Sequence, residues 1–215
     1  MKALDVGLES AVKVRGKLRR DARALGGVEL HCNHIEVFGP SLEGFPIRKG
    51  VGLKFLLDNR HLHLRSPKVA MIMKIRANLM DIARRWLREN GFIEVNCPTF
   101  ITAAVEGGAT LFKLDYFGRT AYLTQSVQFY QEAAIYSLEK VYSLQPSFRA
   151  ELSRTRRHLT EFWHLEVEMA YADLYDIMKV IEELVYAIVS NLSRESKVEL
   201  EALDKVVKPE IAEPP

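Results

Sequence analysis

The alternation of side chains between residues 148 and 169 constrains the fold of this chain most. Residues 161–169 read Glu-Phe-Trp-His-Leu-Glu-Val-Glu-Met. Successive side chains of a β-strand point to opposite faces, so this segment predicts a strand with two unlike faces. One face is apolar and holds Trp163, Leu165, Val167 and Met169, and the other holds Phe162, His164, Glu166 and Glu168. By the same rule Arg149 and Glu151 share one surface of the preceding strand. We therefore expect an antiparallel hairpin.

The loop of this hairpin is basic. It contains Arg154, Arg156, Arg157 and His158, which are hydrogen-bond donors suited to a polyphosphate. Arg149 adds a planar guanidinium that suits a phosphate or a carboxylate. A solvated basic turn explains the same pattern, because an antiparallel sheet commonly has one wet face. Spacing alone leaves both interpretations open.

Length and composition are those of an ordinary globular protein. A chain of 215 residues indicates one or two domains. Its 30 basic and 28 acidic residues are too evenly balanced to indicate a nucleic-acid binder. Cys32 and Cys97 match no metal-binding spacing, so we expect no metal-thiolate site and a reducing, cytoplasmic environment. No apolar run reaches the roughly 20 residues that span a bilayer, so no membrane partner is expected.

Periodicity predicts the remaining elements. Strands are expected at 12–18 and 28–37, around a turn at Gly26-Gly27, and at 92–95 before Pro98. A hairpin is expected from 111 to 125 across Phe117-Gly118, followed by a helix over 127–138. Longer helices are expected at 67–90, capped by Gly91, and at 174–192. Their apolar stripes are Val69, Ile72, Met73, Ile75, Leu79, Ile82, Ala83, Trp86 and Leu87 in the first, and Ile177, Met178, Ile181, Leu184, Val185 and Ile188 in the second.

The segment FRAELSRTRRHLTEFWHLEVEMA (148–170) resembles motif 2 of the class II aminoacyl-tRNA synthetases. Within the aspartyl, asparaginyl and lysyl subgroup it is most similar to the asparaginyl members. The resemblance extends over FPIRKGVGLKFLLDNRHLHLRS (45–66), ENGFIEVNCPTF (89–100, similar to motif 1) and EGGATLFKLDYFGRTAYLTQSVQFYQEAA (106–134). It implies an α+β fold, namely part of a class II catalytic domain with an antiparallel sheet flanked by helices.

The resemblance also implies roles in binding ATP. Arg149 would bridge the α-phosphate and the carboxylate of the amino acid, and thereby stabilise the charge that grows during attack. Glu151 would accept from the adenine amino group, while Phe162 would stack on the adenine ring. Arg157, His158 and Leu159 would lie at the outer phosphates. Mg²⁺ is expected with ATP, although no protein ligands for it are recognised in this chain.

Three further residues are implied in binding the amino acid. Glu106 would bind the substrate ammonium, although from the sequence alone a turn residue before Gly107-Gly108 is the favoured interpretation. Gln128 would lie near the substrate carboxylate or side chain. Gln131 stands where aspartate-selective members carry a lysine, and a neutral amide cannot compensate a buried carboxylate. Asparagine is therefore the expected amino acid.

The resemblance implies a domain organisation. Residues 1–40 would be the C-terminal remnant of an OB-type anticodon-binding barrel, 41–66 a linker, and 67–215 the N-terminal half of the catalytic domain. Motif 3 of the family is not found. A homodimer through residues 67–100 is expected, and tRNA is a possible partner.

Three functions stay open at this stage. The first is activation of asparagine by ATP and its ligation to tRNA, incomplete in this chain alone. The second is an amide-forming relative, which would need aspartate as its substrate. The third is a non-catalytic dimer module or a fragment completed by a partner that carries motif 3.

Overall fold

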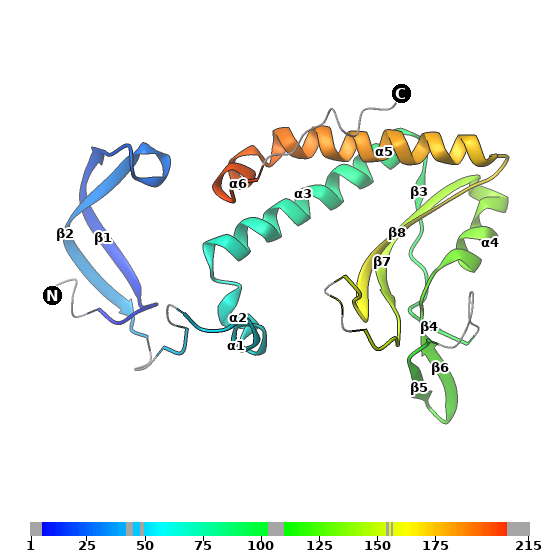
Figure 1. The fold of residues 1–215 in the computed structure, drawn as a ribbon, viewed down its shortest axis with the longest axis horizontal. Coiled ribbons are helices and arrows are strands. Elements are labelled where there is room, and N and C mark those ends of the chain that lie inside the picture. The colour runs from blue at the N-terminus through cyan, green and yellow to red at the C-terminus, as the bar shows by residue number, and fades with distance from the viewer. Residues whose placement is uncertain are drawn as a thin grey trace. The chain divides into compact units, whose positions relative to one another are not determined.

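The computed structural model describes residues 6–41, 45–47, 50–102, 110–153, 155 and 157–205. The chain forms two compact units, Met1–Val69 and Ala70–Pro215. The elements are drawn in Figure 1. None of the helices in the described ranges is both long and apolar enough to cross a membrane.

The first unit contains a long two-stranded hairpin. Strands β1 (Ala11–Arg20) and β2 (Val28–Gly39) pair antiparallel and are joined through a short 3-10 turn, η2 (Leu25–Gly27), in agreement with the strands predicted there. Gly16 lies opposite a register shift, where a Cβ atom would approach the His31 carbonyl oxygen to 2.1 Å. Residues 41–66, expected as a linker, contain two short helices, α1 (Leu53–Asp58) and α2 (Arg60–His63).

The second unit is built around a three-stranded sheet. Its order is β3 (Ile93–Glu94), β7 (Lys140–Phe148), β8 (Glu161–Met169), and the β7–β8 pair is the predicted hairpin. Strand β3 runs parallel to β7. A second three-stranded sheet joins β4 (Phe100–Ile101), β6 (Arg119–Leu123) and β5 (Lys113–Tyr116). The strands of residues 111–170 therefore belong to two sheets, where a single antiparallel sheet was expected, because periodicity does not specify which strands pair.

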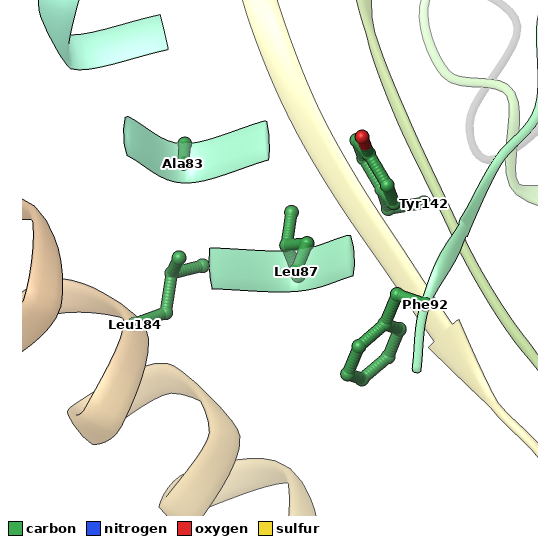
Figure 2. Packing of buried hydrophobic residues seen from close by; sticks show 5 residues of the cluster. All are labelled: Ala83, Leu87, Phe92, Tyr142 and Leu184. Carbon is green, nitrogen blue, oxygen red and sulfur yellow. The ribbon is translucent and has the colours of Figure 1, made fainter. Parts of the chain in front are cut away.

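Two long helices cover one face of the β3-β7-β8 sheet. Helices α3 (Pro67–Glu89) and α5 (Leu174–Glu195) run side by side above it (Figure 1). The core between them contains Ala83, Leu87, Phe92, Tyr142 and Leu184, shown in Figure 2, with Leu165, Val167 and Met169 of β8 packed against it. The apolar face predicted for residues 161–169 is thus the core face, except that Trp163 is 46% exposed.

Polar contacts fix α3 against the C-terminal helices. Asn78 donates to the buried Ser196 hydroxyl at 2.9 Å, and Arg85 pairs with Glu195 at 2.6 Å. Asp173 caps the start of α5 by accepting from the backbone amides of Tyr175 and Asp176. Helix α6 (Lys197–Ala202) follows α5 directly.

The predicted apolar stripes are only partly buried. Ile82, Ala83 and Leu87 of α3 and Leu184 of α5 lie in the core. Ile72, Met73 and Leu79 on α3 and Met178, Ile181 and Val185 on α5 are exposed. Periodicity defines an apolar face but not the length of helix that finds a partner, so these six residues of the predicted apolar stripes lie outside the core.

Candidate active site

The polar face of the β7–β8 hairpin opens into two adjoining cavities. The larger, of about 500 Å³, is lined by Gln125, Ser126, Gln128, Arg149, Phe162, His164 and Glu166. The smaller, of about 300 Å³, is lined by Arg149, Glu151, Arg157, His158, Leu159 and Phe162. We call them the inner and the outer compartment. Arg149 and Phe162 belong to both.

Strand pairing places these side chains together. In the register of β7 and β8, Ser147 lies opposite Phe162, Gln145 opposite His164, and Ser143 opposite Glu166. Phe162, His164 and Glu166 alternate with the core residues of β8 and therefore point away from the core. Helix α4 (Gln128–Leu138) packs on this second face, with the fully buried Val127 at its N-cap. The parity prediction is confirmed for these three residues of β8.

Arg149 lies just beyond the end of β7. Its backbone amide donates to the Thr160 carbonyl at 3.0 Å, which continues the pairing of the hairpin by one residue. Its guanidinium contacts the side chain of Gln125. With the amide oxygen of Gln125 turned toward Arg149, that oxygen accepts from Nε and Nη2 at 3.3 and 3.2 Å. The remaining guanidinium donors are available to an anion at the junction of the two compartments.

The outer compartment gathers all six residues that were predicted to bind ATP. Glu151 follows Arg149 outside strand geometry, yet both line the same cavity. In the loop, the Thr155 hydroxyl contacts His158 Nδ1 and thereby positions the imidazole. Leu159 is 62% exposed and forms an apolar part of the wall together with Phe162. The compartment offers an aromatic face, a carboxylate, two guanidinium groups and an imidazole.

Glu166 organises the inner compartment. Its side chain is 11% exposed. It accepts a short hydrogen bond from the Ser126 hydroxyl and further bonds from the backbone amide of Val127 at 3.2 and 3.3 Å. Ser126 Oγ in turn accepts from the backbone amide of Gln128 at 3.2 Å. The carboxylate therefore fixes the start of α4, and with it the position of Gln128.

Carboxylates beside the inner compartment affect one another. Burial, followed by the charges of Glu132 and Glu166, raises the pKa of Glu168. Burial and the Glu166 charge also raise the pKa of the Cys97 thiol. The backbone of Cys97 is held by Gln145, whose side-chain oxygen accepts from its amide at 3.1 Å while its nitrogen donates to its carbonyl at 3.3 Å. Among the described residues that line the inner compartment, Glu166 is acidic and Arg149 is basic.

Gln131 does not reach either compartment. Its side chain is fully buried, and its Nε2 donates to the Glu166 backbone carbonyl at 3.0 Å. Its Oε1 has no partner among the described residues. One helical turn beyond Gln128, the side chain points into the packing of α4 on β8, and the contact of Gln131 with the amino acid stays a prediction.

Three predicted basic or acidic residues cannot be placed. Glu106, Arg154 and Arg156 lie outside the described residues. Of the other predicted amino-acid-binding residues, Gln128 and Arg149 line the inner compartment. The side chain of Gln128 donates to Glu132 at 2.7 Å.

Sequence reasoning assigned no role to Gln125, Ser126, His164 or Glu166. The parity of β8 already placed His164 and Glu166 on the face of Phe162, which was the signal available for them. Gln125 and Ser126 follow the end of β6. Only the tertiary pairing, in which the Phe148 amide donates to the Thr124 carbonyl at 2.8 Å, brings them beside Arg149.

The sequence profile of the tRNA synthetases class II (D, K and N) matches residues 52–213. This chain belongs to that family. The match covers the whole inner and outer compartments. Of the residues predicted to bind ligands, every one lies within it.

Individual relatives of this family are similar over nearly the full chain. The asparagine–tRNA ligase of Thermococcus gammatolerans is 55% identical over 203 residues, which are 94% of this chain and 47% of that protein. The asparaginyl-tRNA synthetase of Pyrococcus horikoshii, solved with asparaginyl-adenylate, gives a TM-score of 0.88 at 52% identity over 98% of this chain and 49% of that one. The Entamoeba histolytica asparaginyl-tRNA synthetase gives 0.80 at 30% identity, over 91% and 46% of the two chains. The chain spans about half the length of the relatives it matches.

Proposed function

We propose that this chain activates asparagine with ATP, as part of the reaction that joins asparagine to tRNA. The observation that carries the proposal is the convergence on Arg149: the six residues expected to bind ATP line one compartment, and Arg149 also lines the neighbouring one. The relatives named above, which are asparagine–tRNA ligases, support asparagine as the amino acid.

The two compartments suit the two substrates. In the outer compartment Phe162 offers a ring to stack on adenine, Glu151 an acceptor for its amino group, and Arg157 and His158 donors for the outer phosphates. In the inner compartment the amino acid lies near Gln128, with its carboxylate directed at the junction. Arg149 then contacts both the α-phosphate and that carboxylate, and stabilises the charge that develops as they react.

Magnesium is expected only together with ATP. In the part of the chain that the structure describes, no group of three or more His, Cys, Asp or Glu side chains is placed to hold a metal ion. Mg²⁺ would be carried by the phosphates of ATP. Glu106 remains the proposed ligand of the substrate ammonium.

The remaining features of the proposal concern partners and organisation. Residues 1–40 would belong to an OB-type anticodon-binding barrel and residues 41–66 would form the linker. Residues 67–215 would form half of the catalytic domain. The partner of the chain would be tRNA. A homodimer would form through residues 67–100, where Ile72, Met73 and Leu79 expose apolar surface. A cytoplasmic location would follow from this role.

ATP–pyrophosphate exchange tests the proposed activity. The purified chain is assayed with asparagine and with aspartate, alone and with a polypeptide that carries motif 3. We expect exchange with asparagine, reduced by roughly a hundredfold or more in Arg149→Ala, since a transition-state donor of this kind contributes about 10² to 10³ in rate. Arg119→Ala is the matched control, because this exposed arginine lies on β6 and lines neither compartment.

Two results would contradict the proposal. Exchange that is unaffected by Arg149→Ala would remove Arg149 from the reaction. Exchange with aspartate alone would indicate the amide-forming relative instead. If exchange appears only when the motif 3 polypeptide is added, asparagine activation is supported and this chain is incomplete without a partner.

A further inference from the structure

His164 stands on the wall of the inner compartment without a role in the reaction proposed above. It lies between Phe162 and Glu166 on the polar face of β8, and its side chain is 36% exposed. Its ring is tilted against that of Phe162, with the centroids 5.5 Å apart. The imidazole is thus held by its neighbours, and part of it faces the cavity.

The contacts of Nδ1 determine the tautomer of this imidazole. Nδ1 lies 3.2 Å from Glu166 Oε2 and 3.3 Å from Ser147 Oγ. The Glu166 carboxylate already accepts from Ser126 and Val127, so it acts as an acceptor. A lone pair on Nδ1 would repel such an oxygen at this distance, so we assign the proton to Nδ1. The hydrogen bond of Nδ1 is the one with Ser147 Oγ. The Ser147 hydroxyl can rotate to suit either arrangement.

A neutral imidazole protonated on Nδ1 has an acceptor at Nε2. The hydrogen bonds of the described residues leave Nε2 without a protein partner. We propose that His164 is a specificity-determining residue, whose Nε2 accepts a hydrogen bond from the side-chain amide of the amino acid. A side-chain carboxylate has no proton to offer this acceptor, so His164 favours the amide over the acid. The inference rests on the proposed function, which places the amino acid in the inner compartment.

Binding of two non-hydrolysable adenylate analogues tests this role. Asparaginyl and aspartyl sulfamoyl-adenosine are each titrated calorimetrically into the full chain under one buffer condition. We expect the wild-type chain to bind the asparaginyl analogue more tightly than the aspartyl analogue. His164→Phe keeps an aromatic ring but lacks Nε2. The ratio of its affinities for the asparaginyl and aspartyl analogues should therefore fall by roughly fivefold to tenfold, which corresponds to the loss of one hydrogen bond.

One further variant separates this role from a structural one. Ser147→Ala leaves the contact between His164 and Glu166 in place and should keep the wild-type preference for the asparaginyl analogue.

The outcomes distinguish the inference from the proposed function. A His164→Phe variant that binds both analogues with the wild-type ratio would overturn the inference alone. A wild-type chain that binds neither analogue would overturn the proposed function, and the inference with it.

Discussion

Tyr142 joins three elements through one hydroxyl group. Its side chain is 3% exposed, and its hydroxyl donates to Glu94 Oε2 at 3.0 Å. Arg84 Nε donates to the other oxygen of Glu94 at 3.2 Å, so β7, β3 and α3 meet at one carboxylate. Burial, followed by the contact with Glu94, raises the pKa of Tyr142 to about 12. The neutral phenol is therefore the form that the fold stabilises.

We expect Tyr142→Phe to lower the free energy of unfolding by about 1 kcal/mol near neutral pH, because the Glu94 oxygen loses a buried donor. Since the folded pKa exceeds the ordinary value of 10.0, this contribution is complete below pH 10 and is lost as the pH rises toward 12. Urea unfolding of both proteins at about pH 8 and about pH 11 should show the difference narrowing. A difference that is constant with pH would refute this account, and Tyr122→Phe in the other sheet is the control.

Helix α3 ends in a glycine-dependent turn that directs the chain into β3. The Phe92 amide donates to the Leu87 carbonyl at 2.9 Å and the Gly91 amide to the Arg88 carbonyl at 3.1 Å, the pattern of a Schellman motif. Gly91 has φ +82°, and a Cβ atom there would meet nothing within 4 Å. The effect of replacing Gly91 on the stability of the protein would therefore come from backbone strain alone.

Gly91→Ala should cost about 1 to 2 kcal/mol of stability, because an L-residue with a Cβ atom is strained in the left-handed region. Gly91→Asn should cost less, since asparagine enters this region more readily. Chemical denaturation of the two variants measures the difference. Equal costs would show that something other than φ limits this position.

The elements of the fold were more predictable than their pairing. Side-chain alternation was sufficient to place Phe162, His164 and Glu166 on one face of β8, because the period of a strand is local. The parallel pairing of β3 with β7 joins Ile93 to Val141, far apart in the sequence, and no local pattern encodes it. The burial of Gln131 was missed for the same reason: the sequence placed it on the helix but not against β8.

The whole molecule leaves much apolar surface on its long helices. Ile72 is 46% exposed, Met73 45% and Leu79 39% in the part of α3 that lies before the core residues. Isolated exposed apolar residues are common, but several on one helix indicate a contact surface. This is the observation that supports the proposed dimer through residues 67–100.

Sedimentation equilibrium should give twice the mass of one chain. Met73→Asp should shift the protein toward the monomer, because a charge in an apolar contact must be desolvated. Val198→Asp, at an apolar position of α6 that is 74% exposed and lies outside 67–100, should leave the dimer intact. A wild-type chain that sediments as a stable monomer would rule out this dimer.

The shared wall of Arg149 and Phe162 couples the two compartments thermodynamically. A ligand in either one fixes a guanidinium and a ring that the other must also use. The affinity of each compartment then depends on the occupancy of its neighbour, and linkage requires the two effects to be equal in size. ATP and the amino acid would accordingly not bind as independent ligands, even though the proposed function assigns them to separate cavities.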